Sequence, residues 1–313
     1  MEATIAIDFF NVGFGQAIVA YPTVEKFPAL VIDGGDDRPE VYTSSTHAVT
    51  LYEHLRCAGI TEIDLMIATH PHRDHIGGLK EVVEQMPVHR FITFFDMPPA
   101  GQLADEGNMG SALKLYSELL GVLKKKRQCE RDNTAGLRLL SESANFECGK
   151  IKILVYPPGN RSLLDQARVL IGGYCEDKTP DKLDKLSGML NAVCMTLRLD
   201  VNGRKIFLPC DAPLSQWDSI QDDLLSADIM SVAHHGDAAC LSRSLLGKIG
   251  AQYAVICADA KGTYGLPQPE CIEMLRACVA EDVLFTAGGL SKESARGVRL
   301  NIAPSGSVKW EHI

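Results

Sequence analysis

The sequence predicts a mixed α/β (α+β) fold in which two β-rich halves carry helices on their outer faces. Short apolar runs rich in β-branched residues recur in both halves of the 313-residue chain, as is typical of buried strands. Segments with helical periodicity separate several of these runs. Polar residues gather where the apolar runs end, which is where strands pass into loops. We therefore expect one domain over residues 1–313.

The first half begins with a predicted β-meander. "TIAIDFFNVGFGQAIVAYP" contains two β-rich segments joined at "NVGFG", and a third strand, "ALVIDGG", ends on paired glycines. Glycine pairs of this kind mark turns. The elements expected next are a helix at 46–58, a strand at 63–68, a helix near 76–86 and a strand at 90–95.

The middle of the chain, at about 96–190, is a less regular and mainly helical segment. Residues 110–128 form an amphipathic pattern that ends in "KKKR", and cations suit a helix C-terminus. That lysine run is typical of a solvated helix end. Residues 151–158, "IKILVYPP", are predicted to form a strand that prolines stop.

The second half contains the strongest hairpin signal, because two β-rich segments flank Asn202-Gly203. The second of these strands ends at Asp211. The strand in "ADIMSVAHHG" ends at His234 and His235, and "AQYAVICAD" follows as another strand. A helix at 268–279 and the strands "VLFTA" and "VRLNIA" are expected to follow.

Bulk composition narrows the functional classes. The hydrophobic content is 46% and the charged content is 23%, as in soluble globular proteins. A net charge of −9 argues against a surface that grips nucleic acid throughout, although it is compatible with a local basic groove. The ten scattered cysteines include no CxxC pair. With no signal peptide and no apolar run as long as a membrane span, we expect a cytoplasmic protein that contacts no membrane.

The segment "ATHPHRDHIGG", residues 68–78, crowds three histidines and an aspartate behind a buried strand. His70 and His72, two residues apart on a strand-end loop, can bind one divalent ion together. Asp74 and His75 lie further round the turn and point elsewhere, so they can bind a second ion. The sequence therefore predicts a metal site on this loop.

A two-metal site needs further ligands from distant strands, including a carboxylate that bridges the ions. Asp211 and the pair His234 and His235 are the candidates, because each follows a predicted strand. Five of the nine histidines fall in these two short stretches. By contrast, His47, His54, His89 and His312 are interpreted as ordinary core or surface residues.

Six segments, in order, resemble one protein family. "THPHRDH" matches the HxHxDH signature of the metallo-β-lactamase superfamily. The chain is most similar to the metallo-β-lactamase-like domain of ComEC-type competence proteins and their standalone relatives. The resemblance covers residues 8 to about 236 and rests on "DFFNVGFGQAIV", "LVIDGG", "THPHRDHIGGL", "NAVCMTLRL", "GRKIFLPCDAP" and "SVAHHG".

This resemblance implies an αββα four-layer sandwich with a metal cleft along one edge of the two sheets. It implies two divalent ions, Zn²⁺ or Mn²⁺. By resemblance the first ion is held by His70 and His72, the second by Asp74, His75 and His235, and Asp211 bridges them. His234 is then a candidate catalytic residue that steadies a substrate oxyanion, with Asp74 as the other. The resemblance leaves open which histidine of the pair is the ligand.

The chain also departs from the family pattern. Many members have a third histidine on the first metal, where this chain has Asn191, as ComEC-like relatives do. Asn191 is therefore a candidate ligand, and a site poorer in nitrogen makes Mn²⁺ a competitor of Zn²⁺. Cys210 replaces the usual glycine before the bridging aspartate. Asp33 is a candidate for orienting a ligand histidine, although it could equally cap a tight turn.

The resemblance favours a metal-dependent hydrolase, a phosphodiesterase or nuclease that uses a metal-bridging hydroxide. Two alternatives stay open: a hydrolase of lactones, thioesters or β-lactams, and a non-catalytic scaffold of the same fold. The substrate class is left between nucleic acid and a small nucleotide. With 6% aromatic residues, the sequence shows no evident platform for stacking bases. A protein partner encoded beside this chain is compatible with the sequence but not identified by it.

Overall fold

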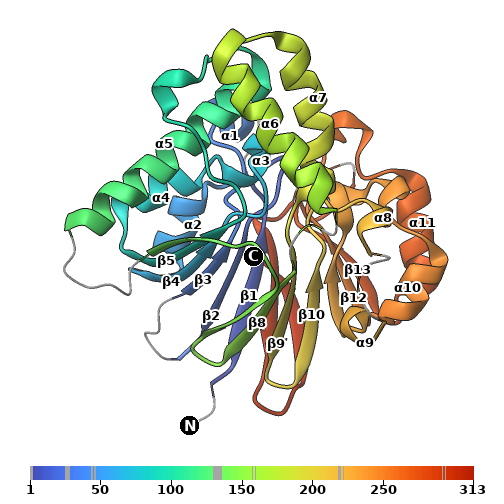
Figure 1. The fold of residues 1–313 in the computed structure, drawn as a ribbon. Helices are drawn as coiled ribbons and strands as arrows, with labels where there is room; N and C mark the ends of the chain where they lie inside the picture. Colours follow the sequence, from blue (N-terminus) through green and yellow to red (C-terminus); the bar gives the residue numbers. More distant parts are fainter. Residues whose placement is uncertain are drawn as a thin grey trace.

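The computed structural model describes residues 3–313 except 25–28, 44, 46, 130–135, 157, 159, 218–219, 221, 291 and 293. Two β-sheets pack face to face, and helices cover the outer face of each (Figure 1). Buried aliphatic side chains from both sheets form one hydrophobic cluster between them. The predicted mixed α/β fold, an αββα sandwich, is confirmed.

The first sheet has eight strands in the order β15-β14-β1-β2-β3-β4-β5-β6. The strands β1, β2 and β3 form the predicted antiparallel meander, and β3 to β6 run parallel. The carboxyl ends of β3 and β4 therefore meet at one edge. The strand bounds are Ile5–Phe10 (β1), Ile18–Pro22 (β2), Ala29–Ile32 (β3), Ile63–Ile67 (β4), Val88–Thr93 (β5), Gly136–Leu139 (β6), Gly297–Ile302 (β14) and Val308–His312 (β15).

The second sheet has seven strands in the order β13-β12-β11-β10-β9-β8-β7. Asn202 and Gly203 join β9 to β10 with φ values of 47° and 79°, which matches the predicted hairpin turn. The strands β10 to β13 are parallel. The bounds are Ala144–Cys148 (β7), Ile151–Tyr156 (β8), Thr196–Val201 (β9), Arg204–Leu208 (β10), Ile229–Ser231 (β11), Tyr253–Ile256 (β12) and Asp282–Phe285 (β13).

Two predicted helices differ in their bounds from the observed ones. The helix expected at 46–58 begins at Leu51, because Thr50 caps it and forms a capping box with Glu53. The helix expected near 76–86 is two short helices separated by Gly77 and Gly78. A Cβ atom on Gly78 would lie 2.4 Å from the carbonyl oxygen of Gly34. Close approach of two backbones therefore explains the glycine at this position.

The helices are distributed over the two outer layers and the top of the sandwich (Figure 1). The helices α6 and α7 lie above the strand ends, and the less regular middle of the chain also contributes three strands. Among the described residues, no helix combines the length and apolarity needed to cross a membrane. The helix bounds are Pro39–Thr43 (α1), Leu51–Cys57 (α2), Arg73–Ile76 (α3), Leu79–Gln85 (α4), Gly107–Cys129 (α5), Arg161–Asp177 (α6), Pro180–Leu190 (α7), Leu214–Trp217 (α8), Asp222–Leu225 (α9), Arg243–Ile249 (α10) and Pro269–Cys278 (α11).

Candidate metal centre

The two sheets deliver polar side chains to one shared edge. Asp33 follows β3, His70 follows β4, Asp211 follows β10, and His235 follows β11. The last three residues of each of these strands are buried, so the sheets fix the backbone just before each functional residue. Polar residues placed on loops at the ends of rigid strands are a common way to build a site.

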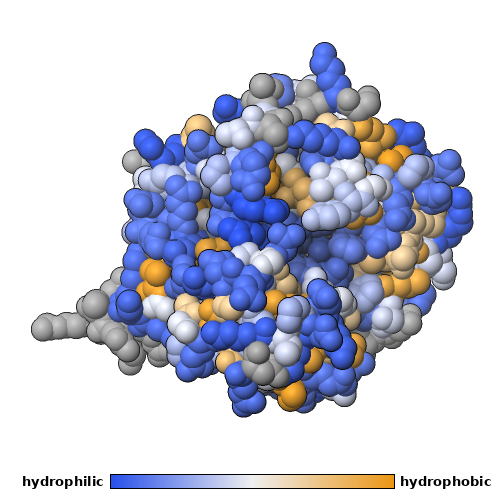
Figure 2. Space-filling model, turned by 90° about the horizontal axis from the view of Figure 1, so that it is seen from above, coloured by the Kyte–Doolittle hydropathy of each residue, from blue (hydrophilic) through white to orange (hydrophobic). Residues whose placement is uncertain are grey.

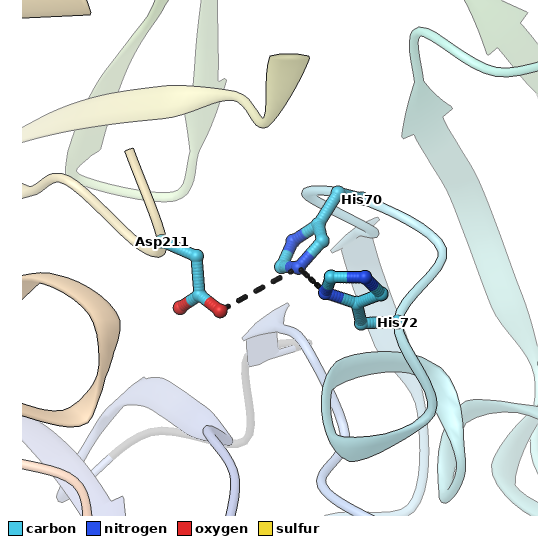
Figure 3. A group of neighbouring side chains, drawn as sticks. All are labelled: His70, His72 and Asp211. Carbon is cyan, nitrogen blue, oxygen red and sulfur yellow. Dashed lines mark hydrogen bonds and ion pairs between the residues drawn. The ribbon is translucent and has the colours of Figure 1, made fainter. Parts of the chain in front are cut away.

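His70, His72 and Asp211 form the first group of potential metal ligands (Figure 3). Nε2 of His70 lies 3.0 Å from Nδ1 of His72 and 3.6 Å from Oδ2 of Asp211. The Asp211 carboxylate faces the two rings from the opposite sheet. Two imidazoles and a carboxylate that converge in this way are a typical donor set for a divalent ion.

Asp74, His75 and His235 form the second group. Nε2 of His235 lies 3.2 Å from Oδ2 of Asp74, and Nε2 of His75 lies 3.8 Å from the same oxygen. Asp211 reaches this group as well. Its Oδ2 lies 3.2 Å from Nε2 of His75, and its Oδ1 lies 3.7 Å from Nε2 of His235. One carboxylate therefore contacts both groups.

Hydrogen bonds fix the orientation of these histidine rings. Asp33 accepts from Nδ1 of His75 at 2.8 Å and from the hydroxyl of Thr69 at 2.8 Å. The Thr69 hydroxyl in turn lies 3.1 Å from Nδ1 of His70. Nδ1 of His235 donates to the carbonyl oxygen of Cys257 at 2.8 Å. Asp33 therefore orients His75 directly and His70 through Thr69. The Nε2 atoms of His70, His75 and His235 face the shared carboxylate of Asp211, whereas His72 approaches His70 through its Nδ1.

Two ring nitrogens of the centre are positioned to bind cations. Nε2 of His75 and Nε2 of His235 are buried, and neither has a hydrogen-bond partner among the described residues. Each of the two nitrogens lies 3.2 Å from a carboxylate oxygen, that of Asp211 for His75 and that of Asp74 for His235, so a cation bound between them would satisfy nitrogen and oxygen together. The donor set of imidazole and carboxylate suits Zn²⁺ and also harder ions such as Mn²⁺.

The electrostatics divide the histidines into two classes. Burial lowers the pKa of His70 well below its ordinary value, and burial likewise lowers that of His72. Burial also opposes protonation of His75 and His235, but the carboxylates around them, led by Asp211, raise both pKa values. In the metal-free protein the second group therefore holds protons more tightly than the first.

The carboxylates respond in the opposite direction. Burial alone would raise the pKa of Asp211, but the positive charges of His75 and His235 hold it well below its usual range. The same two histidines lower the pKa of Asp74 against the effect of burial. Both carboxylates are therefore ionised at neutral pH and available as metal ligands.

Asn191 and His234 lie together beside the first group. Nδ2 of Asn191 donates to Nε2 of His234 at 3.0 Å, and Nδ1 of His234 donates to Oδ2 of Asp237 at 3.2 Å. The buried Oδ1 of Asn191 is left without a hydrogen-bond partner among the described residues. Here Nε2 of His234 accepts a hydrogen bond, so contact between His234 and a substrate oxyanion stays a prediction. His235, not His234, belongs to the second group.

Several residues of the centre adopt left-handed backbone conformations. The φ values are 57° for Asp33, 54° for Cys210, 47° for His234 and 56° for His235. Such values cost energy for residues other than glycine, and they concentrate at functional sites. Cys210 thus adopts a backbone conformation that a glycine would adopt freely. The chain pattern gave no signal for this strain.

The centre opens into a cleft of about 530 Å³. Figure 2, seen from above, shows a hollow on this face with mainly hydrophilic residues around it. Arg38 and Arg73 line the cleft. Arg38 forms an ion pair with Asp36, and Arg73 forms one with Asp37, each at 2.6 Å. Sequence reasoning singled out neither arginine. Each guanidinium is paired with a carboxylate, and a guanidinium held in this way can still donate hydrogen bonds to phosphate or carboxylate oxygens.

Gln16 also lies in the centre without having been predicted. Its amide donates to Oδ2 of Asp33 at 3.1 Å and to Sγ of Cys210 at 3.5 Å. Gly15, the neighbouring residue, approaches the metal loop so closely that a Cβ atom would lie 2.3 Å from the carbonyl oxygen of Asp74. The segment that precedes β2 therefore supports the loop that carries the ligands.

Comparison with solved structures finds proteins of similar fold, and the three named here are at most 14% identical to this chain. No protein-family model and no curated protein matches the sequence. The metallo-β-lactamase fold protein YhfI from Bacillus subtilis is 11% identical, with a TM-score of 0.45 over 91% of this chain and 98% of that one. A diphosphatase of the PhnP family is 14% identical, with a TM-score of 0.47 over 96% and 97%. Zn²⁺-bound PqqB from Methylobacterium extorquens is 9% identical, with a TM-score of 0.47 over 90% and 97%.

Proposed function

We propose that this chain is a dinuclear metal-dependent hydrolase of the metallo-β-lactamase superfamily, related to the ComEC-type domain, and that it cleaves phosphodiesters. The observation that carries the proposal is the position of Asp211. Its two carboxylate oxygens lie within 3.7 Å of ring nitrogens from both ligand groups. A shared carboxylate between two donor sets is the arrangement that a two-metal site requires.

The residues take separate roles in this proposal. His70 and His72 would hold one ion, and Asp74, His75 and His235 the other, with Asp211 shared between them. Two divalent ions bound there would activate a water molecule and offset the negative charge that develops on the substrate. Asp33 keeps the Nε2 atoms of His75 and, through Thr69, of His70 directed inward.

Two features favour a phosphodiester over a lactone, thioester or β-lactam. The unpartnered Oδ1 of Asn191 adds an oxygen donor beside a group with only two imidazoles. Oxygen-rich sites favour harder ions such as Mn²⁺, which bind phosphate oxygens well. Arg38 and Arg73 also line the cleft, and guanidinium groups match the geometry of phosphate oxygens.

A substrate panel tests the proposal. We expect the Mn²⁺-loaded protein to hydrolyse bis-p-nitrophenyl phosphate at least about tenfold faster, in kcat/KM, than a lactone, a thioester or a chromogenic β-lactam. The measurement is initial rates at equal enzyme and metal concentrations, with Mn²⁺ and Zn²⁺ compared. Faster hydrolysis of any of the other three esters or amides would overturn the phosphodiesterase assignment. Bound metal with no turnover of any substrate would favour the scaffold interpretation.

A further inference from the structure

A second cavity adjoins the metal cleft. It measures about 410 Å³, and it shares Phe14, Arg38 and Tyr264 with the cleft as lining residues. The shared residues show that the two spaces are neighbours with one common wall. None of the candidate metal ligands lines this second cavity. Its possible ligand is therefore inferred from the side chains that do line it.

Tyr264, in this common wall, is exposed to solvent. The residue is 75% exposed, so its ring is open to stack on a ligand. Its backbone is left-handed, with φ 57° and ψ 17°, a conformation that costs energy for a tyrosine. Asp259 holds the turn by accepting hydrogen bonds from the backbone nitrogen and the hydroxyl of Thr263. An exposed ring on a strained turn is therefore presented to the two cavities.

Phe14 connects this ring to the metal centre. The Phe14 ring lies 4.5 Å from the His235 ring and 5.1 Å from the Tyr264 ring, and the latter contact is edge-to-face. Gly15 packs its backbone against Asp74, so the Phe14 segment cannot move away freely. A continuous row of rings thus runs from a predicted metal ligand to the second cavity.

Arg38 completes the wall between the two spaces. Its guanidinium donates to both carboxylate oxygens of Asp36, through Nε at 3.0 Å and Nη2 at 2.6 Å. That ion pair fixes the plane of the guanidinium in a wall that Arg38 shares with Phe14 and Tyr264. Planar cations of this kind stack on bases and also bind phosphate oxygens. The wall therefore combines two aromatic rings with one oriented cation.

We propose that the second cavity binds a nucleobase attached to the scissile phosphodiester, with the base stacked on Tyr264. This inference rests on the proposed function and names its substrate class as small nucleotide diesters. Stacking on a fixed aromatic ring is worth about 1–3 kcal/mol per base. The lining also includes polar side chains that suit the polar edges of a base, among them Glu40, Ser45 and Lys261.

The test compares a ligand with and without a base. Calorimetric titration of the Mn²⁺-loaded protein with 5′-AMP and with ribose 5-phosphate isolates the contribution of the base. We expect 5′-AMP to bind at least about tenfold more tightly. Tyr264→Ala should abolish this difference, and Tyr264→Phe should retain it because the ring is kept. Trp310→Ala is the matched control, since Trp310 is a part-exposed aromatic residue that lines neither cavity.

The outcomes separate this inference from the proposed function. Equal affinity for the two ligands in the wild-type protein, or 5′-AMP binding unaffected by Tyr264→Ala, overturns the nucleobase site even if bis-p-nitrophenyl phosphate is hydrolysed. Preference for 5′-AMP without any turnover supports the nucleobase site while contradicting the proposed function. A single-stranded DNA 12-mer provides a further arm. Greater sensitivity of the 12-mer than of 5′-AMP to Tyr264→Ala overturns the assignment to small nucleotides.

Discussion

Replacing Asp211 by alanine is expected to lower kcat/KM for bis-p-nitrophenyl phosphate by a factor of about 10³ or more. Asp211 contacts nitrogens of both ligand groups, so its loss removes a ligand from each predicted ion at once. Metal ions supply several kcal/mol of transition-state stabilisation in such sites, and each 1.36 kcal/mol is a factor of ten in rate. Steady-state rates at saturating Mn²⁺ measure the effect.

Asp64→Ala is the matched control for this variant. Asp64 is also an aspartate in an ion pair, with Arg90 at 2.6 Å, but it lies on β4 away from the cleft. Its replacement should leave kcat/KM within about twofold of wild type, because Asp64 does not line the cleft. The fold should also be retained, because partly exposed ion pairs contribute little to stability. Near wild-type turnover in Asp211→Ala would show that the hydrolysis does not depend on the proposed centre.

Binding of Mn²⁺ or Zn²⁺ is expected to raise the melting temperature of the metal-stripped protein by about 5 °C or more. An ion present at about 100 times its Kd stabilises the folded state by about 2.7 kcal/mol. In a chain of this size about 1 kcal/mol corresponds to about 2 °C. Thermal unfolding after chelation, with and without added metal, measures the shift. Asp211→Ala should show a much smaller one.

The size of this shift should depend on pH in a defined direction. The carboxylates raise the pKa of His75 and of His235 in the metal-free protein. These raised values stabilise the metal-free fold below the unfolded pKa of about 6.5, and that contribution is lost as pH rises through the folded pKa. A metal ion must displace the same protons, so its affinity grows with pH. A metal-induced shift that is unchanged between pH 6 and pH 8 would contradict the assigned ligands.

Much of the site's location could be predicted because each key residue directly follows a buried apolar run. Asp211 and His235 come after strands that the sequence predicts, and parallel strands place their carboxyl ends at a common edge. The hairpin at Asn202-Gly203 could also be predicted, since that dipeptide favours the positive φ values that a two-residue hairpin turn requires. Local sequence therefore predicted the fold class and where the candidate ligands lie.

Other features depend on contacts or conformations that no local pattern encodes. The strands β6 and β7 were missed because they have only four and five residues and are only partly buried. The alternation of apolar and polar residues in β7 is too short to distinguish a strand from a loop. The different directions of His234 and His235 follow from two consecutive left-handed residues. The ring contact between Phe14 and Tyr264 joins segments from opposite ends of the chain. Only tertiary structure brings these residues together.

The metal content of the purified protein tests the central claim most directly. After loading with Mn²⁺ or Zn²⁺ and dialysis, elemental analysis should find two ions per wild-type chain. Asp211→Ala should retain fewer than one, because its carboxylate contacts both ligand groups. No bound ion in the wild-type protein, or two ions retained by Asp211→Ala, would contradict a dinuclear centre built on Asp211.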